Sequence, residues 1–442
     1  MGMKKILLTS LLTLLIPFGA AAQLHLTLDG AVELALSENP TIRIAEMEVA
    51  RYDYVKKQTW GNLLPQVSVG GQINHTFIKQ NMSKGFSLGG DQYTTLSGSL
   101  DASMPLFAPA VYRTLKLNDT QMAAAVESAR ASRITLAAEV RKAFYNILLA
   151  RQSLEVLYEA RATVQRTVDD TELQYKNGLM SEYDLLTAQV QLSNLRPTIL
   201  QTENSIAVAE RLLKMYLSIP EEVEIVVEGE LDALRDEVLA GSEGLSTDLT
   251  DNSDLRTLEL QEELLQRQLR VENATRLPTV GLFGNFTLSG NNMGTFDFQT
   301  MSSIQDGYYW QHPLYAGVQL SIPLFAGLTR MNRSRELKNQ IAQIGEQKEY
   351  VRRQIDVQVR SALNDLMTAR ETMFAQERTV EQARKAYSIS DTRYRAGAGT
   401  ILELNSAQLA RTQAQLDYSQ AIYDYLTAKA EYDRIVGREP IK

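Results

Sequence analysis

The hydrophobic residues of this chain recur with a period of two in four short segments, and with a helical period over most of the remainder. Apolar residues alternate with small or polar residues from Val67 to Phe77 and from Leu96 to Met104. The same alternation returns from Val280 to Leu288 and from Leu314 to Ile322. Strict alternation is typical of β-strands with one apolar and one polar face. The sequence therefore predicts four such strands, in two pairs.

A polar loop is expected between the strands of each pair. The first loop carries a lysine and three glycines: Lys84, Gly85, Gly89 and Gly90. The second loop runs to Pro313 and carries three aromatic residues: Tyr308, Tyr309 and Trp310. Both loops are expected to be exposed.

Two very long helices are predicted. The segment between Pro109 and Gly178 contains neither proline nor glycine over 68 residues. Strong helix formers dominate it, so it predicts one helix about 100 Å long. Its small residues lie on a second face, which favours packing against neighbours on two sides rather than a two-stranded coiled coil. A similar helix is predicted from Leu328 to Ala396, interrupted only by Gly345.

Shorter helices accompany the two long ones. The first is expected to begin with Asp29 as its N-cap and to stop at Asn39-Pro40. Pro197 lies inside another and should kink it, because proline removes one backbone hydrogen bond. The remaining helical patterns cover residues 41–60, 182–217 and 400–436, and a further one follows Asn252.

The order of elements occurs twice. Tyr175 to Gln189 and Tyr394 to Gln408 are similar turns, and their first residues are 219 positions apart. Each has an aromatic residue three before a glycine and a carboxylate six after it. Each turn belongs to the same order of elements, which is helix, strand, strand, long helix, turn and helix. We therefore expect a first structural repeat over residues 23–251 and a second over residues 252–442.

An acidic segment closes the first repeat. Residues 221–251 contain eleven acids and a single base, Arg235, with glycines interspersed. This composition is typical of a solvated excursion from the helical framework. Short strands at Val223 to Val227 and a short helix are both compatible with it.

Residues 1–22 are interpreted as a secretory signal peptide. Lys4 and Lys5 precede an apolar run from Ile6 to Phe18, and three alanines ending at Ala22 form a small-residue cleavage site. The alternative is an anchoring helix, but the run is short for a membrane span. Removal of the two lysines takes the net charge from −8 to −10. An exported protein is expected.

Composition excludes several classes of function. The acidic net charge argues against nucleic-acid binding. Without cysteine the chain has no disulfide, thiolate site or lipidated N-terminus. The three histidines, His25, His75 and His312, lie far apart in the sequence. A mean hydropathy of −0.21 rules out a helical-bundle membrane protein. With no ATP-binding loop, catalytic triad or metal-ligand cluster, we predict no enzyme, cofactor or metal.

The strands constrain the assembly. Each is roughly ten residues long with one apolar face, as in outer-membrane barrels. A soluble sheet with one buried face is the alternative, but no separate apolar helix is available to cover it. Four strands cannot close a barrel, and lipid does not tolerate open sheet edges. Several copies of the chain must therefore contribute to one barrel.

The tandem repeat resembles the TolC-type outer-membrane efflux proteins. The first pair of strands ends in Pro105-Leu106-Phe107-Ala108-Pro109 and the second in Pro323-Leu324-Phe325-Ala326-Gly327. These segments and the two turns, each with a tyrosine three residues before a glycine, are similar to that family over essentially the whole mature chain. The order of the repeats is more specific than any one motif.

The resemblance implies an α+β membrane protein. A homotrimer would form a 12-stranded outer-membrane β-barrel, with four strands per chain, continued by a long α-helical periplasmic barrel. It would be the passive exit duct of a tripartite efflux or type I secretion system. Its partners would be a periplasmic adaptor, an inner-membrane pump and outer-membrane lipid. An exported structural coiled-coil surface protein is the alternative, although it does not explain two matched pairs of two-faced strands. Cargo and pump class stay open.

The resemblance also implies a periplasmic gate at the two turns. Asp184 and Glu403 occupy matching positions and are candidates for an acidic ring. The alternative is that each acid only complements the positive end of its helix. Tyr175 and Tyr394 are candidates for hydrogen bonds across the closed tip, or for simple packing.

The second turn departs from the family pattern. Gly399 stands where some members have a basic residue, and Ser406 where a second acid would be. We therefore expect a weaker charge lock at this turn. The expected adaptor contacts are Gly178, Leu179, Met180, Ser181, Gly397, Ala398, Gly399 and Thr400.

Overall fold

The computed structural model describes residues 24–76, 93–240, 245, 248–292 and 308–439. The interpreted signal peptide, residues 1–22, lies outside this described part. So do Phe77, the expected loop with Lys84, Gly85, Gly89 and Gly90, and Gly241 and Gly244 of the acidic segment.

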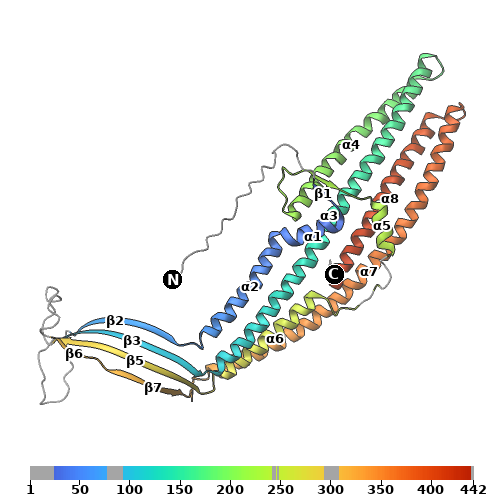
Figure 1. Cartoon of the computed structure of the whole chain (residues 1–442). Helices are drawn as coiled ribbons and strands as arrows, with labels where there is room; N and C mark the ends of the chain where they lie inside the picture. The colour runs from blue at the N-terminus through green and yellow to red at the C-terminus, as the bar shows by residue number, and fades with distance from the viewer. Residues whose placement is uncertain (1–23, 77–92, 241–244, 246–247, 293–307, 440–442) are drawn as a thin grey trace, which may run out of the picture. The chain divides into compact units, whose positions relative to one another are not determined.

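Long helices and a small sheet make up the described chain (Figure 1). The N-terminal half contains β1 (Leu24–Leu26), α1 (Leu28–Glu38), α2 (Pro40–Gly61), β2 (Gln66–Thr76), β3 (Tyr93–Phe107), α3 (Pro109–Lys176), α4 (Glu182–Leu217), β4 (Ile225–Val227) and α5 (Leu231–Ala240). The C-terminal half contains α6 (Ser253–Ala274), β5 (Thr279–Asn292), β6 (Tyr308–Gln311), β7 (Leu314–Ser321), α7 (Thr329–Arg395) and α8 (Ile401–Val436).

The two long helices are confirmed. Helix α3 has 68 residues and α7 has 67. Gly345 lies inside α7 without ending it, and Pro197 lies inside α4. None of the helices in the described part is both long and apolar enough to cross a membrane.

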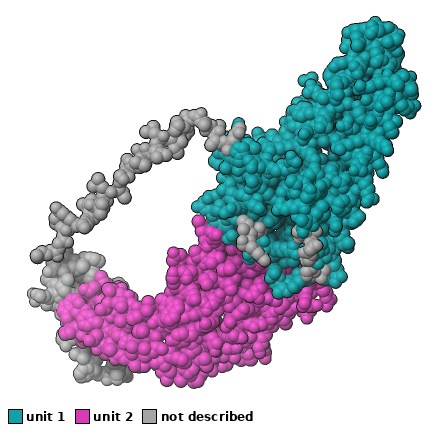
Figure 2. Space-filling view, turned by 45° about the vertical axis from the view of Figure 1, so that its right-hand side comes forward, with its two compact units in different colours: residues 1–43, 132–251, 356–442 teal, residues 44–131, 252–355 magenta. Residues whose placement is uncertain are grey.

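The chain divides into two compact units (Figure 2). One unit contains residues 1–43, 132–251 and 356–442, and the other contains residues 44–131 and 252–355. Each unit takes segments from both sequence repeats. Helices α3 and α7 contribute to both units, because the boundaries at 131/132 and 355/356 fall inside them.

The unit with residues 44–131 and 252–355 contains an antiparallel sheet. Strand β2 pairs with β3, β3 with β5, and β5 with both β6 and β7. The two repeats meet at the pairing of β3 with β5, where Asp101 is opposite Asn285 and Leu100 is opposite Phe286. The predicted alternation is therefore confirmed, because most polar residues face polar ones across the sheet and most apolar residues face apolar ones, with Ser103 opposite Phe283 as an exception.

The prediction that the residues before Pro313 form a loop is wrong in part. Tyr308 to Gln311 form strand β6, which pairs with Ser289 to Asn292 of β5. Aromatic residues favour strands, so this polar and aromatic segment extends the sheet. Pro313 has no N–H to donate to a ladder, and it separates β6 from β7. Its carbonyl oxygen still accepts a hydrogen bond from the Thr287 N–H at 3.0 Å.

The helices that precede or follow these strands in the chain pack in pairs. Helix α2 lies along α3, where the Asn118 amide donates to the Thr59 hydroxyl at 2.6 Å and Lys56 pairs with Asp119 at 2.8 Å. Helix α6 lies along α7, where Lys348 of α7 donates to the Glu262 carboxylate of α6 at 3.3 Å, and Arg276, just after α6, donates to the Ser334 hydroxyl at 2.7 Å. Each of the shorter helices is thus held beside a long one by side-chain hydrogen bonds.

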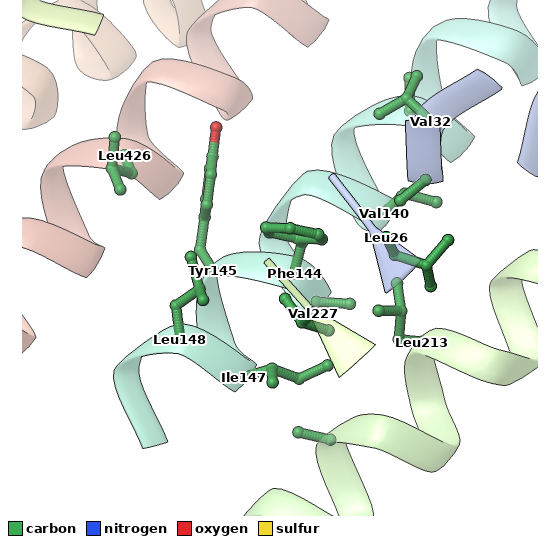
Figure 3. Packing of buried hydrophobic residues seen from close by; sticks show 14 of the residues in the cluster. Leu26, Val32, Val140, Phe144, Tyr145, Ile147, Leu148, Leu213, Val227 and Leu426 are labelled. Atoms are coloured by element: carbon green, nitrogen blue, oxygen red, sulfur yellow. The ribbon is translucent and has the colours of Figure 1, made fainter. Parts of the chain in front are cut away.

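The other unit has the largest hydrophobic core. It is built around Val140, Phe144 and Ile147 of α3, which are fully buried. Figure 3 shows them beside Leu26 of β1 and Leu213 of α4. Residues of α1, α5, α7 and α8 complete this core.

Both alternatives for the acidic segment occur in the structure. Ile225 to Val227 form β4, and α5 follows from Leu231. Strand β4 pairs in parallel with β1, an element that the sequence pattern did not indicate. The expected N-cap of α1, Asp29, is wrong. Thr27 is the N-cap, because its hydroxyl accepts the Gly30 N–H at 3.2 Å and Asp29 lies in the first turn.

Candidate functional site

The two similar turns have the same backbone geometry. In the first, the Gly178 N–H donates to the Tyr175 carbonyl at 2.9 Å and the Leu179 N–H donates to the Gln174 carbonyl at 2.9 Å. This pair of bonds is a Schellman motif, which requires a left-handed residue at the first position after the helix. Gly178 has a φ of 75°, which glycine adopts without steric cost.

The second turn repeats this geometry. The Gly397 N–H donates to the Tyr394 carbonyl at 2.9 Å, and the Ala398 N–H donates to the Arg393 carbonyl at 2.8 Å. Gly397 has a φ of 70°. The glycine three residues after each tyrosine is therefore explained by the helix ending itself.

Asp184 completes a capping box at the start of α4. Its N–H donates to the Ser181 hydroxyl oxygen at 3.2 Å, and its carboxylate accepts the Ser181 N–H at 3.3 Å. The same carboxylate oxygen also accepts the Ser181 hydroxyl at 2.6 Å. Asp184 thus stabilises the helix end that follows the first turn.

Glu403 has a different role at the start of α8. The Thr400 hydroxyl accepts the Glu403 N–H at 3.2 Å, but the carboxylate of Glu403 approaches Arg393 at 3.7 Å. Arg393 also donates to the carbonyl of Ala398 at 3.2 Å, so it spans the turn. A basic residue, Arg393, is therefore present at the second turn, although position 399 is a glycine.

Gly399 allows Arg393 and Glu403 to approach each other. A Cβ atom at position 399 would lie 3.2 Å from the Tyr394 nitrogen, 3.3 Å from the Arg393 Cβ and 3.3 Å from a Glu403 carboxylate oxygen. These separations are tight for any side chain. Ser406, the other departure from the family pattern, is exposed on α8.

A small hydrophobic core joins the two turns. Its buried members are Val168 of α3, Ala188 of α4, Tyr394 of α7, and Ile401 and Leu404 of α8. Met180 of the first turn packs against this tip core. The tip is therefore one packed group of four helix ends.

The two tyrosines at equivalent sequence positions lie in different environments. Tyr394 is 7 % exposed, and its hydroxyl is 3.0 Å from the hydroxyl of the fully buried Thr171. Burial raises the pKa of Tyr394. Tyr175 is 40 % exposed. Tyr394 thus forms a hydrogen bond between helices α7 and α3 of the same chain, whereas Tyr175 remains accessible.

Charged groups beside the tip core were not identified from the sequence. Arg166 and Asp170 of α3 line a cavity of about 40 Å³ together with Asp391 and Arg395 of α7. Arg395 donates to Asp391 at 3.1 Å. The available signal was the charged residues at every second position directly before the second turn, Asp391, Arg393 and Arg395.

Arg411 of α8 crosses to both long helices. Its guanidinium lies 5.1 Å from the centre of the Tyr387 ring of α7 and 3.9 Å from a carboxylate oxygen of Glu159 in α3. Burial raises the pKa of Tyr387, which keeps the ring neutral beneath the cation. These contacts extend the link between the helix pair α3 and α4 and the helix pair α7 and α8 beyond the tip core.

The first turn exposes a large apolar side chain, Leu179, where the second has Ala398. Leu179 is 74 % exposed and Tyr183 is 70 % exposed. Ala398 and Leu402 occupy the corresponding positions in the second turn. The expected contact residues are exposed or half-buried at both turns. In the described part of the chain, no group of His, Asp and Glu side chains is arranged to hold a metal ion.

The sequence profile of the family described as "Outer membrane efflux protein" matches residues 31–217 and 245–438, which include both turns and all strands of the sheet. The chain belongs to this family.

Relatives in the efflux protein family match most of the chain. The alkaline protease secretion protein AprF of Pseudomonas aeruginosa is 23 % identical over 410 residues, covering 91 % of this chain and 82 % of AprF. The outer membrane protein TolC of Escherichia coli strain K12 is 21 % identical over 380 residues, covering 85 % of this chain and 75 % of TolC.

Solved structures share the fold. The Campylobacter jejuni CmeC outer membrane channel has a TM-score of 0.73 and 15 % identity, covering 93 % of this chain and 85 % of CmeC. The open-state MtrE outer membrane channel of Neisseria gonorrhoeae has a TM-score of 0.69 and 17 % identity, covering 93 % and 88 %.

The family assignment fixes the class and the location of this efflux protein. It is an α+β membrane protein of the cell outer membrane, with a long helical extension in the periplasm. Members of the family are channels, and this chain is an outer-membrane exit duct of efflux or secretion systems.

Proposed function

We propose that three copies of this chain form one duct, which conducts small molecules or proteins passively as the outer part of a tripartite efflux or type I secretion system. Each copy contributes four strands to a shared 12-stranded barrel and its helices to a shared periplasmic barrel. No enzymatic step is involved. A periplasmic adaptor and an inner-membrane pump supply recognition and energy.

The exposed apolar face of the sheet carries this proposal. Val69 is 82 % exposed, Leu314 is 74 % exposed and Val67 is 65 % exposed, and all three lie on the apolar side of their strands. In the described part of the chain, β2 pairs only with β3, and β7 only with β5. A sheet in lipid must close on itself, so the edges of β2 and β7 are paired with those of other copies.

Closure of the tip is the proposed gate. Asp184 and Glu403 from each copy would form an acidic ring, which attracts cations and raises their local concentration. Tyr175 is exposed and available for contacts between copies, whereas Tyr394 holds one chain's own hairpins together. Ser406 adds an uncharged polar group on the exposed side of α8.

The adaptor is proposed to contact both turns, over residues 178–181 and 397–400. Leu179 gives the first turn an exposed apolar contact, while Gly397, with open space beside it, lets another backbone approach the second. The two turns therefore offer the adaptor unlike surfaces.

Mass measurement tests the shared barrel. The purified chain in detergent, measured by light scattering with the detergent contribution subtracted, is expected at three times the mass of the mature chain. A monodisperse species with the mass of one chain, with its helical content intact, would sink the proposal.

A further inference from the structure

A cavity of about 580 Å³ opens into the unit that contains the largest core. It lies at the junction of α1, α3, α5 and α8, distant in sequence from the two turns. Its apolar wall consists of Leu28, Leu234, Val238, Leu426 and Ala430. Cavities of this size are typical of sites for small organic ligands.

Tyr145 reaches into this cavity from the core. The residue is only 4 % exposed, yet its hydroxyl has no hydrogen-bond partner among the described residues. Figure 3 shows its oxygen pointing away from Phe144, on the side of Leu426. The hydroxyl is thus free to bond to a group that enters the cavity, while the rest of the side chain is held in the core. The cavity supplies room for that group.

Charged groups of both signs act on the Tyr145 hydroxyl. Burial raises the pKa of Tyr145 to about 12, and Glu237, Asp433 and Asp29 add to this effect while Arg141 opposes it. The hydroxyl therefore stays neutral and can accept a hydrogen bond from a cation.

Two of these carboxylates have no partner in the described part of the chain. Asp433 accepts hydrogen bonds from Lys429 at 2.6 and 2.7 Å and from Arg438 at 3.2 Å, so its charge is compensated. Asp29 and Glu237, in contrast, make no hydrogen bond or ion pair with another described residue. Both are exposed at the mouth of the cavity. The charged lining is acidic overall, with four carboxylates against Arg141 and Lys429.

We propose that this cavity binds a small organic cation, with an ammonium group held by Asp29, Glu237 and the Tyr145 hydroxyl and an apolar body against Leu28, Val238 and Leu426. Four elements meet around the ligand, so its binding stabilises the packing of α1 and α5 on α3 and α8. The site does not depend on the proposed trimer or on conduction.

The test uses the full mature chain in lipid nanodiscs, with empty nanodiscs as the blank. Isothermal titration calorimetry with 4-phenylbutylamine is expected to show saturable binding at one site per chain. The neutral 4-phenylbutanol and the anionic 4-phenylbutyrate have the same body and different head groups. Both are expected to bind at least tenfold more weakly. Equal binding of all three would overturn the proposal, because the carboxylates would then have no role.

Substitutions locate the binding at the cavity. Asp29→Asn and Glu237→Gln are each expected to weaken 4-phenylbutylamine about tenfold, the usual effect of losing one hydrogen bond to a charged group. Tyr145→Phe is expected to weaken it severalfold. Glu222→Gln, which removes an exposed acid outside the cavity, is the matched control and is expected to leave binding unchanged. Wild-type binding by Asp29→Asn and Glu237→Gln variants with unaltered thermal unfolding would overturn the assignment.

Discussion

Tyr175 and Tyr394 occupy equivalent positions in the two repeats, but only Tyr394 is inside the tip core. Its neighbour Thr171 belongs to α3, 223 positions earlier in the sequence. A single sequence gives no signal for a pair at such a separation. The equivalence of the two turns is therefore visible in the sequence, whereas the difference in what their tyrosines do depends on packing.

Removal of the Tyr394 hydroxyl tests this difference. Tyr394→Phe leaves the ring in place but removes a buried hydrogen bond, so the tip is expected to lose about 1 kcal/mol of local stability. Hydrogen exchange of the amides from Ala396 to Leu404 should become severalfold faster. Tyr175→Phe is the matched control and is expected to leave this exchange unchanged, since Tyr175 is exposed. Equal effects of the two substitutions would contradict the assigned roles.

The acidic ring is tested at the same scale. Replacing both Asp184 and Glu403 by alanine is expected to weaken cation selectivity, measured as the reversal potential across a bilayer with a salt gradient. Asp184→Ala also removes the capping box, which costs about 1 kcal/mol at the start of α4. Asp184→Asn with Glu403→Gln is therefore the second variant, because it removes the charges with less effect on the cap. Unchanged selectivity in both variants would remove these residues from the conducting path.

At the scale of elements, glycine has opposite roles at two positions near and within α7. Gly397 has a positive φ, so Gly397→Ala is expected to cost about 1–2 kcal/mol and to lower the midpoint of thermal unfolding. Gly345 lies in the helix interior with open space around its Cα. Gly345→Ala is expected to stabilise by about 1 kcal/mol and to raise the midpoint. Circular dichroism measures both unfolding midpoints. If the two substitutions shifted the midpoint in the same direction, this interpretation of the turn would be contradicted.

Helix α8 is held to α3 by an ionic network with a defined dependence on pH. Glu431 accepts from Arg434 at 2.6 Å and from Lys142 of α3 at 2.7 Å. These bonds lower the pKa of Glu431 from 4.5 to about 2, and the bond with Arg434 has the largest effect. A lowered pKa contributes stability that is complete above pH 4.5 and is lost as the pH falls toward 2.

The unfolding midpoint is therefore expected to fall between pH 5 and pH 3 with a steeper slope in the wild type than in Glu431→Gln. Circular dichroism at a series of pH values measures both slopes. The effect should be modest, because Glu431 is partly exposed and solvent screens the pair. Parallel slopes would show that Glu431 does not couple α8 to α3.

The limits of prediction from the sequence also lie at the scale of elements. Periodicity predicts α3, α7 and the four main strands, because each pattern is long enough to exclude other structures. The three-residue strands β1 and β4 have no such pattern, and they form only because Leu26 and Val227 meet in the core. The N-cap of α1 was misplaced by two residues, since both Thr27 and Asp29 are good capping residues. Strand β6 was missed because its polar and aromatic residues do not alternate.

At the scale of the whole molecule, the exposed apolar face of the sheet and its unpaired edges lead to the same conclusion. An isolated chain would present both to lipid, and neither is stable there without closure. Membership of the outer membrane efflux protein family gives that closure a function, as an exit duct. In the sequence, the two Schellman turns follow the C-terminal ends of α3 and α7, whereas strands β3 and β7 precede the N-terminal ends of these helices.

Single-channel recording tests the central claim most directly. The purified wild-type protein, inserted into a planar lipid bilayer under a salt gradient, is expected to give current steps of uniform size with a reversal potential on the cation-selective side. A variant with the sheet face disrupted, Val69→Asp, is the control for insertion, because a charge facing lipid opposes it. The contradicting result is an absence of current steps from wild-type protein that is recovered from the bilayer lipid as a folded oligomer.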